Sequence, residues 1–130
     1  MAGIVSPFLP ITKGDAVRPA GGYNDVMDHT LIVIKRLCQA GQVVFTAKAE
    51  AEMIRDGLRR ADVIEAILHA ESITKRLRSN NPLTGRRETL YVIDSTTWDG
   101  QSVYTKGKLS LQGEPARFYV LISSKRSVLP

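Results

Sequence analysis

The chain has 130 residues, of which 43% are hydrophobic and 24% are charged, a balance typical of a single globular domain. This composition excludes a collagen-like or wholly disordered protein, and no apolar run approaches the ~20 residues that span a bilayer. The net charge is +5, and all of it lies in residues 71–130, because residues 1–70 hold equal numbers of acidic and basic side chains. A basic half beside a neutral half indicates a polyanionic partner, usually nucleic acid, although solubility explains such a charge about as well.

Residues 1–24 are rich in helix-breaking residues, with three prolines and four glycines. We therefore expect a flexible N-terminal tail over residues 1–24 and a single domain over residues 25–130. The one cysteine, Cys38, can form neither an intramolecular disulfide nor a zinc site by itself. We expect a protein of the reducing cytoplasm that needs no metal and no cofactor.

Three helices are predicted in the first half of the chain. The first covers residues 25–40, where apolar residues recur on one helical face, and Gly41 ends it. The second covers residues 46–56, with Thr46 as the N-cap and an apolar stripe of Ala49, Met53 and Ile54. In the third helix, Asp62 is the predicted N-cap and Glu65, three residues later, completes a capping box.

The second half of the chain has the alternation and turn residues of β-strands. Strands are predicted over residues 90–93, 101–112 and 117–124, with a possible fourth over residues 72–78. Turns are predicted at residues 79–82, 98–100 and 112–115. The expected fold is therefore α+β, with three N-terminal helices packed on one face of a C-terminal antiparallel sheet of three to four strands.

The strand over residues 101–112 places Tyr104, Lys106 and Lys108 on one face, because side chains alternate along a strand. The next strand ends close to Lys125 and Arg126, and Lys75 and Arg76 add charge from the first strand. Such a basic face suits a phosphodiester, since lysine and arginine bind phosphate oxygens. Cleaving RNA also requires a group that accepts the 2′-OH proton and cations that stabilise the transition state. Simple binding of an acidic partner explains the same face equally well.

Several sequence blocks resemble the MqsR-type bacterial toxins, which belong to the RelE superfamily of mRNA interferases. The resemblance covers about residues 28–127 and rests on the blocks Leu37–Val43, Phe45–Thr46, Glu52–Leu58, Asp62–Ile67, Val103–Lys108 and Tyr119–Lys125. It implies a RelE/MqsR-like fold whose active site is a basic sheet face with a strand tyrosine and a C-terminal lysine, matched here by Tyr104 and Lys125. A further lysine of the family lies in the first strand, where Lys75 and Arg76 both remain candidates.

The resemblance implies the toxin of a type II toxin–antitoxin system, a metal-independent endoribonuclease that cleaves mRNA and arrests growth. Lys125 and Arg126 are then expected to stabilise the transition state, and Tyr104 to transfer a proton or stack on a base. Phosphates would be held by Lys75, Arg76, Lys106 and Lys108. The implied partners are mRNA, free or on the ribosome, and a cognate antitoxin with a zinc-binding CxxC domain and a helix-turn-helix, with no membrane involved. The alternative is a non-catalytic RNA- or protein-binding module of the same fold.

Overall fold

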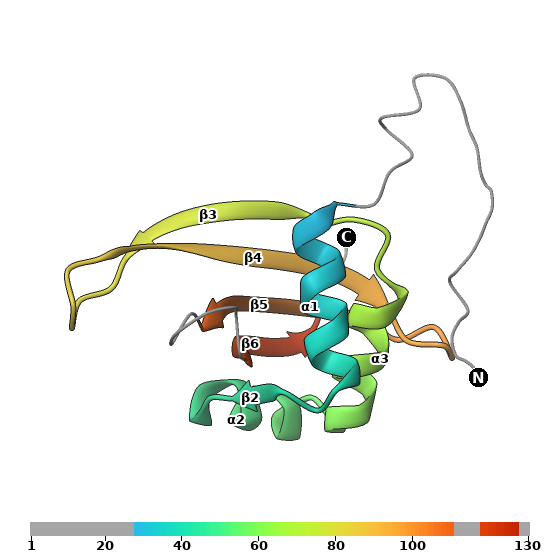
Figure 1. Ribbon diagram of the computed structural model, residues 1–130. Coiled ribbons are helices and arrows are strands. Elements are labelled where there is room, and N and C mark those ends of the chain that lie inside the picture. The colour runs from blue at the N-terminus through green and yellow to red at the C-terminus, as the bar shows by residue number, and fades with distance from the viewer. Residues whose placement is uncertain (1–27, 111–117, 128–130) are drawn as a thin grey trace, which may run out of the picture.

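A computed structural model describes residues 28–110 and 118–127, which form three helices and one five-stranded sheet (Figure 1). In chain order the elements are α1 (His29–Gln39), β2 (Val43–Phe45), α2 (Ala47–Arg55), α3 (Arg60–His69), β3 (Lys75–Asn80), β4 (Arg87–Thr96), β5 (Ser102–Ser110) and β6 (Phe118–Arg126). The tail predicted over residues 1–24 and the turn predicted at residues 112–115 lie outside the described residues.

The fold is α+β, as predicted, but the sheet differs from the expected one in two respects. Its strand order is β2-β6-β5-β4-β3, so it has five strands rather than three to four. It is mixed rather than antiparallel, because β2 pairs with β6 in parallel while the other neighbours are antiparallel. The helices are also not all N-terminal to the sheet, since β2 lies between α1 and α2.

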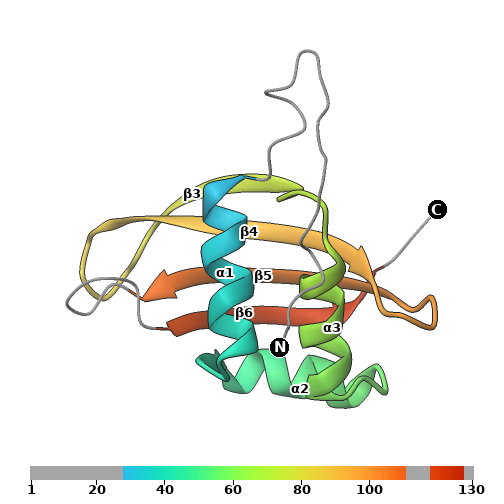
Figure 2. The same cartoon turned by 45° about the vertical axis from the view of Figure 1, so that its right-hand side comes forward.

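The helices cover one face and one edge of the sheet. Figures 1 and 2 show α1 and α3 lying across one face of the sheet, whereas α2 runs along the β2–β6 side. No described helix covers the opposite face of β3 to β6. We call this surface the open face; its side chains include Lys75, Val92, Asp94, Tyr104, Lys106, Lys108 and Lys125. Among the described residues, no helix is both long and apolar enough to cross a membrane.

Local signals in the sequence place most helix ends correctly. Thr46 caps α2 by accepting a hydrogen bond from the amide of Ala49 at 3.2 Å. The cap predicted for α3 is wrong, because the N-cap is Arg59 and Asp62 occupies the third helical position. From there the Asp62 carboxylate accepts a hydrogen bond from the Arg59 amide at 2.9 Å, so the same side chain caps the helix from inside its first turn. Ile54, which the sequence places in the apolar stripe of the second helix, is 76% exposed.

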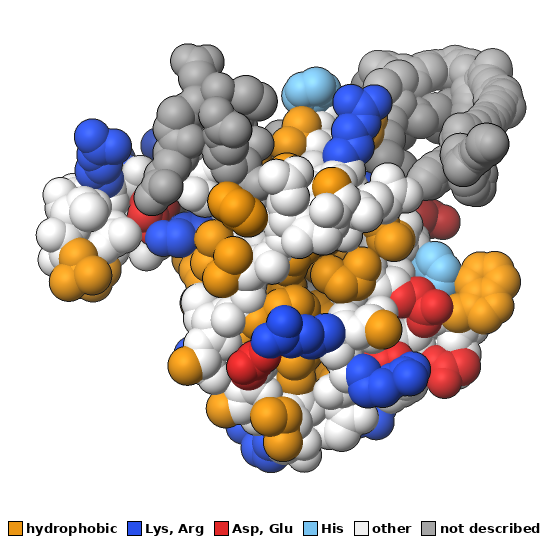
Figure 3. Space-filling model, turned by 60° about the horizontal axis from the view of Figure 1, so that its bottom comes forward, with side chains coloured by type: hydrophobic (Ala, Val, Ile, Leu, Met, Phe, Trp, Pro, Cys, Tyr) orange, Lys and Arg blue, Asp and Glu red, His pale blue; other side chains and the backbone are white. Residues whose placement is uncertain are grey.

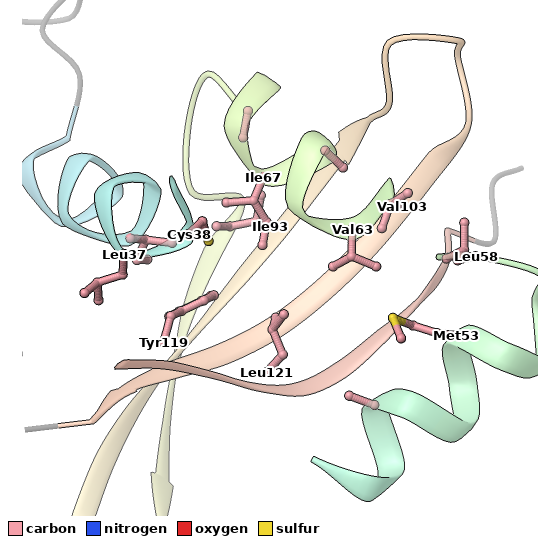
Figure 4. Packing of buried hydrophobic residues seen from close by; sticks show 14 of the residues in the cluster. Leu37, Cys38, Met53, Leu58, Val63, Ile67, Ile93, Val103, Tyr119 and Leu121 are labelled. Atoms are coloured by element: carbon pink, nitrogen blue, oxygen red, sulfur yellow. The ribbon is translucent and has the colours of Figure 1, made fainter. Parts of the chain in front are cut away.

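The core lies between the helices and the sheet (Figure 4). Side chains of α1 and α3 meet the inner face of β4, β5 and β6, and Met53 of α2 joins them from the side. The labelled core residues are Leu37, Cys38, Met53, Leu58, Val63, Ile67, Ile93, Val103, Tyr119 and Leu121. Burial raises the pKa of the Cys38 thiol to about 12, so this cysteine stays protonated and acts as a small apolar core residue.

Candidate nucleic-acid interface

The central strand β5 alternates as the sequence predicts. Val103, Thr105 and Gly107 are buried toward the helices, whereas Tyr104 and Lys106 lie between them on the open face. The candidate site is therefore built on a strand with one side in the core and the other side facing away from the helices.

Tyr104 and Lys125 are direct partners across the β5–β6 pair. The Lys125 Nζ lies 5.4 Å from the centroid of the Tyr104 ring, which is a cation–π contact. On its other side, Tyr104 is opposite Asp94 of β4, whose carboxylate accepts a hydrogen bond from the Ser127 hydroxyl at 2.8 Å. A carboxylate, a phenol and an ammonium group thus follow one another across three neighbouring strands.

A second row of side chains runs parallel to the first. Lys75 of β3 is opposite Val92 of β4, and Val92 is opposite Lys106 of β5. This register decides between the two first-strand candidates in geometric terms. Arg76 alternates to the helix side, where it forms an ion pair with Asp28 and lies over the Tyr91 ring at 5.7 Å. Of the two, only Lys75 shares the open face with Tyr104 and Lys125.

Lys108 lies on the open face, but its charge is already balanced. Its Nζ is 3.2 Å and 3.3 Å from the two carboxylate oxygens of Glu88. The side-chain amide of Asn81 also donates a hydrogen bond to the Glu88 carboxylate at 2.9 Å. These hydrogen bonds, from Asn81 first and Lys108 next, hold the pKa of Glu88 below its ordinary value. This ion pair leaves Lys108 less available to an external anion than the sequence predicts.

Arg126 does not join the predicted group. It is opposite Val103 and so lies on the helix side of the sheet, where its Nε donates to the Asp56 carbonyl at 3.0 Å. The reason is the alternation of the strand, which sends Lys125 and Arg126 to opposite faces. The prediction that both residues border one site is wrong.

Carboxylates of α2 hold the strand that carries Lys125. Glu52 accepts hydrogen bonds from the Ser123 hydroxyl at 2.6 Å and from the Ser124 amide at 3.1 Å. Asp56 accepts one from the Arg126 amide at 2.8 Å. These bonds satisfy backbone donors at the edge of β6 beyond the end of β2. They fix the backbone on both sides of Lys125, so α2 positions this lysine without covering it.

Sequence reasoning missed Asp94 and Ser127. The alternation of Leu90, Val92 and Asp94 in β4 was a usable signal for Asp94, because it places all three on one face. The two histidines give no such signal, and His69 is held away from the open face by the Thr96 carbonyl at 3.1 Å and by the Trp98 ring. Within residues 28–110 and 118–127, no three His, Cys, Asp or Glu side chains are grouped as metal ligands.

No protein family, curated protein or solved structure matches the chain. Lys75, Lys106 and Lys125 are cations on a sheet face that no described helix covers, and the only acid beside them in the two rows of described residues is Asp94. Such a surface can neutralise phosphate oxygens, stack an aromatic ring on a base and exchange a proton at a carboxylate or phenol.

Proposed function

We propose that this protein is a metal-independent endoribonuclease that cleaves mRNA on its open face, as the toxin of a toxin–antitoxin pair. The observation that carries the proposal is that Lys75, Lys106 and Lys125 share one sheet face with Tyr104, with Lys125 in contact with the tyrosine ring, on a surface that no described helix covers. The resemblance of the sequence blocks to MqsR-type toxins supports the same function and a RelE/MqsR-like classification of the α+β fold. The cytoplasm is the proposed compartment, because mRNA is the substrate.

The proposed reaction uses a nucleophile that RNA itself supplies. The 2′ oxygen attacks the adjacent phosphorus, the O2′–P bond forms, and the P–O5′ bond breaks. The proton of the 2′ hydroxyl passes to a base on the protein, and the leaving 5′ oxygen takes a proton from the Tyr104 hydroxyl or from water. The products are a 2′,3′-cyclic phosphate and a 5′ hydroxyl.

The side chains divide this work by their positions. Lys125 and Lys106 neutralise the charge that grows on the non-bridging oxygens, and Lys75 holds a neighbouring phosphate. Tyr104 transfers a proton or stacks on a nucleobase of the RNA. Asp94, opposite Tyr104 across the β4–β5 pair, is the carboxylate placed to accept the 2′ proton.

A non-catalytic RNA- or protein-binding module is the second candidate. The observation in its favour is that no described histidine lies on the open face, so the surface lacks the most common general base. Binding alone would use the same lysines and would leave the phosphodiester bonds intact. The two candidates therefore differ in whether new RNA ends appear.

The test is induced expression of the wild-type protein and of three variants in bacteria. We expect the wild type to arrest growth and to create new 5′ ends in cellular mRNA, read by primer extension. Lys125→Ala and Tyr104→Phe should be folded and non-toxic, with the loss of Lys125 lowering the cleavage rate by roughly 10²–10³, as for a single oxyanion donor. Arg36→Ala removes an exposed cation on the helix side and should remain toxic.

Three results would contradict the proposal or the residues assigned to it. Full toxicity of Lys125→Ala at matched expression would remove Lys125 from the reaction. Growth arrest without new 5′ ends would favour the binding module. Loss of folding in Lys125→Ala, seen by circular dichroism, would show that Lys125 is structural.

A further inference from the structure

The β3–β4 hairpin carries a second group of cations, away from the lysines of the open face. Figures 1 and 2 show this hairpin projecting beyond the helices. We call residues 78–89 the arm. Arg78, Arg86 and Arg87 of the arm are all exposed. Figure 3 shows Lys and Arg side chains on this projecting part, at the left of the molecule.

Register places two of these arginines on the same side of the arm. Arg78 is opposite Thr89, and Arg87 is opposite Asn80, so the two arginines are diagonal neighbours across the strand pair. Diagonal neighbours lie about 7–8 Å apart, within reach of long side chains. Arg86 adjoins them in the turn, which is held by a 2.8 Å hydrogen bond from the Asn81 amide to the Arg86 carbonyl.

The arm arginines have no carboxylate partner among the described residues, unlike two neighbouring cations, Arg76 of β3 and Lys108 of β5. Arg76 pairs with Asp28, and Lys108 pairs with Glu88. By contrast, the side-chain contact seen for Arg78 is a weak one to the neutral Thr89 hydroxyl at 3.4 Å. Three guanidinium groups are therefore available to an anion, and the planar guanidinium binds phosphate through two hydrogen bonds.

β3 connects the arm to the lysines of the open face. It is the outer strand of the described sheet. Lys75 lies on its open side and Arg78 on its helix side, three residues further along, a distance of about 10 Å at the rise of a strand. A flexible polyanion lying on the lysines can therefore pass over the β3 edge and reach the arm without crossing a helix.

We propose that the arm binds the phosphate backbone of a single-stranded RNA that continues beyond the lysines, so that the preferred substrate is an extended strand. This inference rests on the proposed function, because it takes the open face as the RNA site. RNA fits better than an acidic protein because three arginines follow a continuous path with the lysines, matching a regularly charged chain. Charges on an edge strand can also serve to prevent edge-to-edge pairing between molecules, and the experiment below distinguishes this role from RNA binding.

The experiment measures the affinity of the full chain for two non-cleavable 2′-O-methyl RNAs, of about 6 and about 20 nucleotides, by fluorescence anisotropy at salt concentrations from roughly 50 to 200 mM. The long RNA should bind more tightly and with a steeper salt dependence. The variant Arg78→Gln/Arg86→Gln/Arg87→Gln should keep its affinity for the short RNA. For the long RNA, the slope of log K against log salt should decrease by about 2, since each single-strand phosphate contact contributes ~0.7.

A matched control removes the same charge from the helix side. Arg36→Gln/Arg59→Gln/Arg60→Gln alters three exposed cations of α1 and the start of α3 and should leave both RNA affinities and both slopes unchanged. In a third variant, Lys75→Gln/Lys106→Gln/Lys125→Gln, binding of both RNAs should weaken, because the lysines are common to both.

The outcomes separate the inference from the proposed function. If the arm variant binds the long RNA as the wild type does, the inference is overturned while the open face keeps its role. The same conclusion holds if the arm variant aggregates but still binds the long RNA normally. It also holds if the variant loses affinity for polyglutamate, a probe for an acidic protein partner, and keeps its affinity for RNA. If the lysine variant binds both RNAs normally, the RNA site on the open face is itself wrong.

Discussion

Gly107 is the residue whose substitution tests the packing beneath the candidate site most sharply. A Cβ atom added at this position would lie 2.6 Å from Cζ and 2.7 Å from the hydroxyl oxygen of Tyr119, and 2.9 Å from the Val120 carbonyl oxygen. Non-bonded carbon atoms in contact normally lie about 3.5–4 Å apart. Tyr119 is fully buried, so its ring is packed among other core side chains and can shift only if they shift as well.

The expected cost of Gly107→Ala follows from this overlap. Overpacking a core costs about 1–3 kcal/mol, while replacing glycine by alanine within a strand returns roughly 0.5–1 kcal/mol. We therefore expect a net loss of about 1–2 kcal/mol in the free energy of unfolding and a Tm lowered by roughly 4–8 °C. Because Gly107 lies directly beside Lys106, where the β5–β6 register shifts, the substitution should also weaken RNA binding.

A double-mutant cycle identifies the cause. Tyr119→Leu removes the distal ring atoms and is itself destabilising, by about 2–4 kcal/mol, because it leaves a cavity. In that background the overlap with the ring is gone and only the 2.9 Å approach to the Val120 carbonyl oxygen remains, so Gly107→Ala should cost clearly less than in the wild type, with a coupling energy of about 1–2 kcal/mol. Urea unfolding of the four proteins, followed by circular dichroism, measures it. An equal cost of Gly107→Ala in both backgrounds would refute the proposed clash with Tyr119.

Three further predictions concern the fold. Burial opposes ionisation of Glu52, but hydrogen bonds from Ser123, Lys48 and Ser124 outweigh this effect and lower the pKa of its carboxyl group. The stability that the ionised Glu52 gives to the fold should therefore be complete above pH 4.5 and be lost as the pH falls further. In Glu52→Gln the urea midpoint should change less between neutral and acidic pH than in the wild type. Lys35→Met should lose about 1–3 kcal/mol of unfolding free energy in the same assay, because the Lys35 ammonium donates to two carbonyls at the end of α3. Tyr119→Phe should be as stable as the wild type or more stable in thermal unfolding, because the buried hydroxyl has no hydrogen-bond partner among the described residues.

The parts of the site that depend on local periodicity could be predicted from the sequence. In a half-buried strand, apolar and polar residues alternate between the core face and the opposite face. The positions of Tyr104 and Lys106 therefore follow from residues 101–112 alone. The hairpin then brings Lys125 to Tyr104. Arg126 was misplaced because its neighbour in the chain was treated as its neighbour in space, although alternation separates the two.

Non-local pairings could not be predicted in the same way. β2 has three residues, too few to show a period, and it is defined by its pairing with the distant strand β6. The register shift beside Gly107 depends on the packing of Tyr119, which no local pattern reveals. The same holds for Lys108, whose neutralisation by Glu88 comes from a partner on the adjacent strand.

The chemical nature of the RNA ends tests the proposed reaction most directly. Purified protein is incubated with a long RNA in EDTA, and the new ends are identified by mass spectrometry. We expect 2′,3′-cyclic phosphates and 5′ hydroxyls, formed by the wild type and by Arg36→Ala but not by Lys125→Ala. Ends with a 3′ hydroxyl and a 5′ phosphate, cleavage that requires an added divalent metal, or intact RNA would contradict a metal-independent endoribonuclease on the open face.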